Sequence, residues 1–95
     1  MTYEQEIYDD RGQLLSAVER VDADTEILRS WSKSGVLILE AYTSKGEYNG
    51  RYRSWWDNGV LKEEGTFASG KRIGIYRWYL ESGVLWQEVN CDDAL

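Results

Sequence analysis

The sequence predicts an all-β fold: an antiparallel meander of repeated β-hairpins in a single elongated, twisted sheet. The first observation is a Gly-Val-Leu tripeptide that recurs at a fixed interval of 24 residues, and a period of this length is typical of a repeat protein. The second is the composition, with five Trp, seven Tyr, nine Gly and no Pro, which favours strands and tight turns. The three tripeptides begin at Gly35, Gly59 and Gly83.

Other side chains keep the same phase, so the repeat involves more than its turns. One set is basic, one aromatic and one acidic, and each set places the same chemical type once in every repeat. Stacked copies of one supersecondary unit bring such residues into rows. The sets are Arg29, Arg53 and Arg77; Trp31, Trp55 and Tyr79; and Glu40, Glu64 and Glu88.

Each repeat carries two turn signals, which set the expected strands. The first is Ser34-Gly35, Asn58-Gly59 and Ser82-Gly83, and the second is Lys45-Gly46 and Ser69-Gly70. Asn-Gly is the strongest short hairpin signal, because a type I′ turn needs positive φ at both central residues. We therefore expect two-residue turns at these sites, and strands near residues 28–33, 36–43, 48–56, 60–67, 73–80 and 84–91.

The N-terminal quarter fits a decayed earlier copy with one residue deleted, in which Gly12 stands for Gly35. This alignment adds strands near residues 3–9 and 13–20. Leu14, Leu15, Val18 and Val21 also fit helical spacing, so a short N-terminal helix remains open. The length indicates a single domain. We divide residues 1–95 into a degenerate first repeat or cap (1–27) and three repeats (28–51, 52–75 and 76–95).

The turn at Asn58-Gly59 predicts a register. A two-residue loop there places Arg53 opposite Glu64, and the same rule pairs the equivalent Arg and Glu of the other repeats as opposite charges. It also places Tyr52 opposite Gly65, where the absence of a side chain lets a ring lie flat across the strand. Two-residue loops at the other turns pair Leu61 with Trp78 and Leu39 with Tyr52. The remaining predicted pairs are Arg29–Glu40, Arg77–Glu88, Tyr76–Val89, Leu28–Ala41 and Gly65–Gly74.

Alternation along the strands separates two faces. The first is largely apolar and is the better core, and the second mixes aromatic and charged residues. The first face carries Leu28, Leu37, Leu39, Tyr52, Trp56, Leu61, Tyr76, Trp78, Leu80, Leu85 and Val89, and the second carries Arg29, Trp31, Ile38, Glu40, Arg53, Trp55, Lys62, Glu64, Arg77, Tyr79, Trp86 and Glu88.

Residues 50–61 and their copy at 74–85 resemble the variant MORN repeat, whose pattern runs Gly-x-aromatic-x-x-aromatic-aromatic-x-x-Gly-x-Leu. An acidic position follows at Glu64 or Glu88, and then a Gly-Lys turn at Gly70-Lys71. The resemblance covers residues 28–91 well. It implies hairpins stacked side by side in an elongated sheet, no shared catalytic residues, and a bacterial antitoxin-like or immunity-like role. Eukaryotic MORN arrays are associated with membrane lipids and scaffolding.

Composition argues against several functions. Eleven Lys and Arg against 17 Asp and Glu give a formal charge of −6, which disfavours direct binding to nucleic acid or an anionic membrane and favours a basic protein partner. The absence of His removes the usual triads and zinc sites. We expect no enzyme activity, cofactor or metal. The lone Cys91 and the lack of a visible secretory or membrane-spanning segment predict a cytoplasmic protein.

The sequence thus predicts a non-catalytic protein-binding module that masks or inhibits a basic partner such as a toxin, nuclease or effector. Trp, Tyr and Arg dominate interface hot spots, whereas packing of the rings on one another is the structural alternative. A carbohydrate-binding module using the Trp/Tyr row and a self-assembling scaffold, with a homodimer, are the competing hypotheses. The residues expected to contact the partner are Trp31, Trp55, Tyr79, Trp86, Arg29, Arg53 and Arg77.

Overall fold

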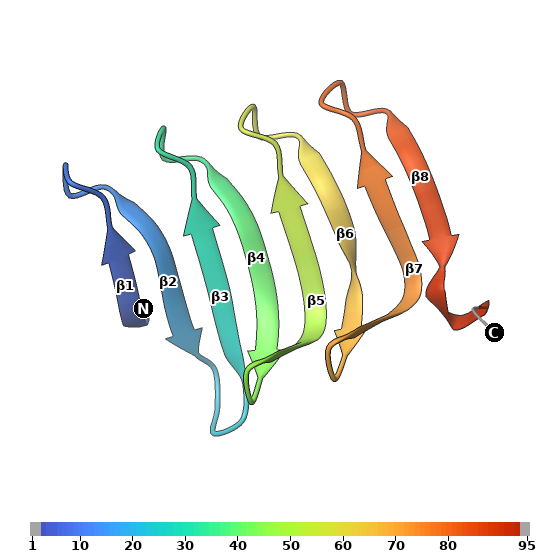
Figure 1. Ribbon diagram of the computed structural model, residues 1–95, viewed down its shortest axis with the longest axis horizontal. Helices are drawn as coiled ribbons and strands as arrows, with labels where there is room; N and C mark the ends of the chain where they lie inside the picture. Colours follow the sequence, from blue (N-terminus) through green and yellow to red (C-terminus); the bar gives the residue numbers. More distant parts are fainter. Residues whose placement is uncertain (1–2, 94–95) are drawn as a thin grey trace.

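The computed structural model describes residues 3–93 and shows an open antiparallel sheet of eight strands in chain order (Figure 1). The predicted meander of hairpins is therefore confirmed. A short 3-10 helix, η1 (Cys91–Asp93), follows the last strand. The strands are β1 (Tyr3–Tyr8), β2 (Leu14–Arg20), β3 (Glu26–Trp31), β4 (Leu37–Ser44), β5 (Glu47–Trp55), β6 (Leu61–Ala68), β7 (Lys71–Tyr79) and β8 (Leu85–Asn90).

The N-terminal segment forms a hairpin of β1 and β2, and residues 14–20 are extended rather than helical. The helical alternative for this segment is therefore wrong. The backbone N–H of Asp9 donates to the carbonyl of Gln13 (2.9 Å), and the N–H of Gly12 donates to the carbonyl of Asp9 (3.1 Å). The same two hydrogen bonds close the turns at Gly35, Gly59 and Gly83.

The turns at these glycines differ from the predicted type. Trp56 N–H donates to the carbonyl of Val60 (2.8 Å), and Gly59 N–H donates to the carbonyl of Trp56 (2.9 Å). Gly59 has φ of 88°, whereas Asn58 is not among the residues with positive φ. The loop is therefore a three-residue turn whose left-handed Gly forms a bulge, and the type I′ prediction at Asn58-Gly59 is wrong.

A second irregularity restores the predicted register one pair later. Trp55 pairs with Leu61, but Ser54 already pairs with Glu63. The extra residue on β6 is Lys62, so the predicted partners in the middle of the strands still meet. Arg53–Glu64, Tyr52–Gly65, Arg29–Glu40, Leu28–Ala41, Arg77–Glu88 and Tyr76–Val89 are all confirmed.

The turns at Lys45-Gly46 and Ser69-Gly70 are the ones with the type I′ signature. Their φ values are 53° and 81° for the first turn, and 51° and 83° for the second. Positive φ at both central residues matches the right-handed twist of the flanking strands. The type I′ geometry thus belongs to the turns that lack the Asn-Gly signal.

The register beyond these two turns differs from the prediction. Between the pairs Thr66–Ile73 and Glu64–Arg77, β7 contains two more residues than β6. A glycine with positive φ, Gly74, lies in this bulge (φ 65°). As a result, Trp78 pairs with Glu63 instead of Leu61, and Gly65 does not pair with Gly74. An equivalent bulge at Gly50 makes Leu39 pair with Ser54 instead of Tyr52.

An aromatic cluster covers the apolar face over β5, β6 and β7. The ring of Tyr76, which is only 1% exposed, lies over Gly65, so the ring above this glycine is not that of its register partner Tyr52. The Tyr76 hydroxyl donates to Glu63 (3.0 Å), and the Arg72 guanidinium lies 4.5 Å from the Tyr76 ring centroid. The members of the cluster are Tyr48, Tyr52, Phe67, Tyr76 and Trp78.

Burial is shared between the two faces. Ala41 and Tyr76 are buried on the apolar face, whereas Ala17, the register partner of Arg29, is buried on the charged face. The bulge at Lys62 also mixes the faces, because the Lys62 ammonium lies 4.6 Å from the ring centroid of Trp56. The strict division of these two residues between opposite faces is therefore wrong.

Candidate functional site

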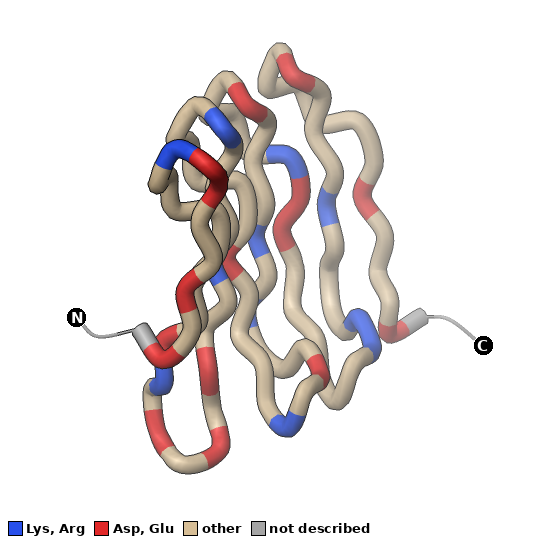
Figure 2. Tube along the Cα trace, turned by 60° about the vertical axis from the view of Figure 1, so that its left-hand side comes forward, with Lys and Arg blue, Asp and Glu red and all other residues tan. Residues whose placement is uncertain are grey.

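A row of acidic and basic side chains, the charge row, crosses the charged face from β2 to β8. Its members are Glu19, Arg29, Glu40, Arg53, Glu64, Arg77 and Glu88. Figure 2 shows acidic and basic residues alternating from strand to strand across the middle of the sheet. Opposite charges on neighbouring strands stabilise their pairing and fix its register. The N···O distances are 2.7 Å for Arg29–Glu19, 2.9 Å for Arg29–Glu40, 2.7 Å for Arg53–Glu40, 3.4 Å for Arg77–Glu64 and 2.6 Å for Arg77–Glu88.

Glu40 is the best-enclosed carboxylate of this row, with a side chain that is 16% exposed. Burial alone favours its neutral form, but hydrogen bonds from Arg53 and Arg29 outweigh burial and hold the pKa of Glu40 below its ordinary value. The carboxylate therefore remains charged between two guanidinium groups. This part of the row is structural, because its charges satisfy one another.

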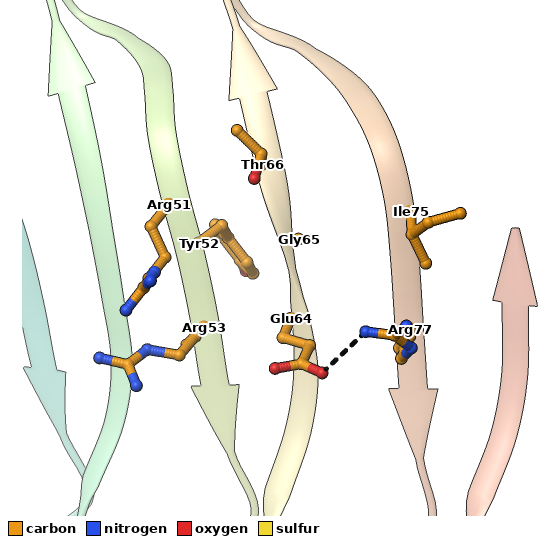
Figure 3. Close-up of a pocket in the computed structure, with 8 residues that line it drawn as sticks. All are labelled: Arg51, Tyr52, Arg53, Glu64, Gly65, Thr66, Ile75 and Arg77. Atoms are coloured by element: carbon orange, nitrogen blue, oxygen red, sulfur yellow. Dashed lines mark hydrogen bonds and ion pairs between the residues drawn. The ribbon is translucent and has the colours of Figure 1, made fainter. Parts of the chain in front are cut away.

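The row is interrupted between β5 and β6. Arg53 and Glu64 are register partners, but they are not joined by an ion pair within residues 3–93: Arg53 binds Glu40 and Glu64 binds Arg77. A hollow of about 320 Å³ lies here, with the sticks of Figure 3 showing the lining side chains. The Nε of Arg53 is buried and finds no hydrogen-bond partner among the described residues.

The interruption divides the row into two groups of different charge. The first group contains Arg29 and Arg53 with two glutamates, so its charges balance. In the second group, Glu64 and Glu88 share the single guanidinium of Arg77. The C-terminal end of the row therefore has an excess of negative charge.

The predicted aromatic row holds equivalent places in the sheet. Trp31, Trp55 and Tyr79 are each the last residue of a strand before a turn. All three are partly buried. The Tyr79 hydroxyl donates to Glu64 (2.8 Å), and the Arg53 guanidinium lies 5.4 Å from the Trp55 ring centroid. These contacts give two of the rings structural roles.

The last hairpin exposes apolar side chains instead of burying them. Trp86 on β8 is 64% exposed, the largest exposed fraction among the large apolar side chains of residues 4–92. Every residue of β8 is exposed, in contrast to the interior strands. The exposed apolar residues of this hairpin and its turn are Ile73, Ile75, Leu80, Val84, Leu85, Trp86 and Val89.

A second, more apolar hollow lies beside β8 on the face of the aromatic cluster. Its volume is about 760 Å³, and Phe67, Trp78 and Val89 contribute apolar walls. Arg72 lines it too, with its guanidinium 5.5 Å from the Trp78 ring centroid. The exposed apolar side chains of the last hairpin therefore lie on both faces of the sheet, because Val89 lines this hollow and Ile75 lines the hollow between Arg53 and Glu64.

The structure thus separates the seven residues that the sequence grouped as a site. Arg29, Arg53 and Arg77 belong to the charge row, whereas Trp86 lies at the open edge. The sequence did not single out Phe67, because it has no counterpart in the other repeats. The exposure of Val84 was also missed, because its equivalents Val36 and Val60 are partly buried.

Within residues 3–93, no helix has the length and apolar character to cross a membrane. In the same residues, no cluster of three or more His, Cys, Asp or Glu side chains is placed to hold a metal ion.

Two segments of the chain match the model of a known repeat family. Residues 48–69 and 72–92 each match the family model described as the MORN repeat variant. The first segment contains most of β5 and all of β6, and the second contains most of β7 and all of β8. Each match therefore covers one hairpin closed by a three-residue bulged turn. No curated protein and no solved structure gave a significant match. The chain thus contains MORN-type repeats in its C-terminal half.

Proposed function

We propose that this chain is a non-catalytic protein-binding module that contacts its partner through the C-terminal hairpin, β7 and β8. The observation that carries the proposal is the number of exposed apolar side chains on this hairpin and its turn, of which Trp86 is the most exposed. Several large apolar side chains exposed on one hairpin are typical of an interaction surface.

The residue types on this hairpin suit such a role. Trp is the side chain most enriched in interface hot spots, because it removes a large apolar area from water at a low entropic cost. Val84 and Leu85 next to Trp86 extend the apolar area. The predicted arginines have a different role in this proposal: they hold the strand register, and Trp86 is the anchor.

More specifically, we propose that binding masks or inhibits the partner, as an antitoxin or an immunity protein does. The formal charge of −6 supports a basic partner, because complementary charge raises the rate of encounter. The excess of carboxylates at the C-terminal end of the row places negative charge on the strands next to these apolar side chains.

The glycan-binding alternative gains less support. A sugar stacks on an open ring face, but the ring of Trp55 lies beside the Arg53 guanidinium and the hydroxyl of Tyr79 is bound to Glu64. Trp86 is open, but it is not part of an aligned row.

The test is affinity capture from the native cell with the wild-type chain and two variants. Trp86→Asp is expected to lose the captured protein, because a charge replaces the apolar anchor. Ile7→Asp is the matched control, since Ile7 is an exposed apolar residue on the opposite edge strand. Equal recovery with wild type and Trp86→Asp, or recovery of no protein by the wild type, would overturn the proposal.

A further inference from the structure

Glu88 on β8 is the last residue of the charge row, and the outer edge of β8 has no neighbouring strand among residues 3–93. β8 pairs with β7 alone among the described strands. The helix η1 turns back toward β7, where Asp92 accepts a hydrogen bond from the backbone N–H of Gly74 (3.0 Å). The outer edge of β8 is therefore left uncovered within residues 3–93, with its outward backbone groups available to another strand.

From this arrangement we infer that the partner docks by adding an extended strand to β8, with a basic residue opposite Glu88 flanked on both sides by apolar residues. The inference rests on the proposed protein-binding function and specifies the partner's chemistry. Strand addition supplies main-chain hydrogen bonds, and the alternating side chains supply specificity.

The basic residue follows from the charge row. On the interior strands, glutamates of the row have arginines on the neighbouring strands, and Glu40 has one on each side. Glu88 has Arg77 on its inner side only, and it shares Arg77 with Glu64. A Lys or Arg on an added strand would complete the pattern and balance the charge.

The apolar flanks follow from the other face of the same strand. Val89, next to Glu88, pairs with Tyr76 and lines the apolar hollow beside the aromatic cluster. Gln87 pairs with Trp78 on that face. Side chains of an added strand opposite these two residues would lie over the hollow and extend the aromatic surface.

A second copy of this chain fits the edge poorly. Glu6 on β1 lies level with the row, because it pairs with Ala17, the register partner of Arg29, and Glu88 ends the row on β8. Both edge strands therefore present a glutamate at the same level, and neither contains Lys or Arg. Continuing the row with another copy would place two carboxylates opposite each other, which is destabilising.

The experiment uses the full chain and two short, capped, fluorescent peptides. One has a central arginine between valines, and the other has glutamate in place of the arginine. Fluorescence polarisation is expected to show binding of the arginine peptide about tenfold tighter than that of the glutamate peptide. Glu88→Lys should reverse this preference. Glu88→Gln keeps the shape of the side chain but removes its charge, and it should abolish the preference. This variant tests the same contact if Glu88→Lys does not fold.

Glu6→Lys is the matched control, because it reverses a charge on the other edge strand and should leave the preference unchanged. Failure of the arginine peptide to bind, equal affinity for the two peptides, or a preference that follows Glu6 would overturn strand addition at β8. Self-association of the free chain that Trp86→Asp abolishes, seen by sedimentation, would do the same. Capture that depends on Trp86 but not on Glu88 would leave the proposed function standing and remove this inference alone.

Discussion

Gly65 shows how a single missing side chain lets an aromatic ring cross the sheet. A Cβ at this position would lie 2.2 Å from Cδ2 of Tyr76 and 2.6 Å from Cε2, far inside van der Waals contact. Gly65 has no positive φ, so its role is steric. The ring that fills the space is the largest fully buried side chain among the described residues.

Gly65→Ala is therefore expected to destabilise the fold by about 1–3 kcal/mol, since the ring must leave its position. The measurement is the free energy of unfolding from denaturant titration. In a Tyr76→Ala background the same change should cost much less, because the clash is then gone. An unchanged stability of Gly65→Ala in the wild-type background would contradict this account of the packing.

The tyrosines of the aromatic cluster predict a loss of stability in alkali. Burial, followed by the charge of Glu63, raises the pKa of Tyr52 to about 12. Burial and then the hydrogen bond to Glu63 raise the pKa of Tyr76 still further. The neutral forms are favoured in the folded chain, so their stabilisation is complete below pH 10, the ordinary tyrosine value, and is lost as the pH rises above it.

Ultraviolet titration of phenolate absorbance should show that Tyr52 and Tyr76 ionise last, and Tyr76→Phe should remove one of these late steps. Denaturant titrations of the wild type should give a falling free energy of unfolding from pH 10 to pH 12. The fall should be smaller for Tyr76→Phe. Ionisation of all the tyrosines near pH 10 would show that these rings are not enclosed.

At the scale of the element, two Ser-Gly turns differ in the backbone conformation of their serine, so a glycine in its place has opposite effects on stability. Ser69 precedes Gly70 and has φ of 51°, a left-handed conformation that strains a residue with a Cβ. Ser82 precedes Gly83 but does not have positive φ. Glycine relieves strain at the first position and only adds chain entropy to the unfolded state at the second.

Ser69→Gly is thus expected to stabilise the protein by about 0.5–1 kcal/mol, and Ser82→Gly to destabilise it by a similar amount. Thermal and denaturant unfolding of the two variants measure the signs. Ser69→Gly keeps the backbone N–H that donates to Asn49. Changes of the same sign in both variants would show that the two turns do not differ as described.

Loss of an arginine from the charge row should cost more unfolding free energy at the buried end of the row than at its exposed end. The Arg29 side chain is 16% exposed and binds two carboxylates, whereas that of Arg77 is 40% exposed. Arg29→Met should cost about 1–2 kcal/mol of unfolding free energy, because it leaves Glu19 and Glu40 with fewer partners in a poorly hydrated place. Arg77→Met should cost less, and its cost should shrink further in salt. A larger cost for Arg77→Met would contradict the burial difference.

Particular residues show how much of the fold could be predicted from the sequence. The recurring Arg and Glu predicted the mid-strand register correctly, because opposite charges at a fixed period favour one pairing. The bulges at Gly50 and Gly74 escaped prediction, since a glycine in a strand is compatible with several local geometries. Asn58-Gly59 misled because Asn adopts positive φ more often than most residues but still favours negative φ, as it does here.

The candidate site was predictable only in part. Trp86 was among the expected contact residues, but nothing in the sequence ranked it above Trp31 or Trp55. Its prominence comes from its position on an edge strand, where a further repeat would otherwise cover it. The aromatic cluster was predicted in part, because Tyr52, Tyr76 and Trp78 were assigned to the apolar face. Tyr48 and Phe67 have no aromatic counterparts in the neighbouring repeats, so periodicity did not identify them.

At the scale of the whole molecule, the sheet has two edges with different surfaces. The extents of 45 × 36 × 18 Å describe an extended slab with little interior, so stability depends on contacts between neighbouring strands, as in other repeat proteins. Both edge strands carry glutamates and no basic residue, but the larger group of exposed apolar side chains lies at the β8 end. This asymmetry is the reason that the proposed binding is placed at one edge.

Amide hydrogen exchange of the full chain, with and without the arginine-centred peptide, tests this placement most directly. The account predicts that the peptide slows exchange at amides of β8 and leaves β1 unchanged, because new main-chain hydrogen bonds form only at the C-terminal edge. Slower exchange at β1 alone, or no change at β8 when the peptide is bound, would contradict it.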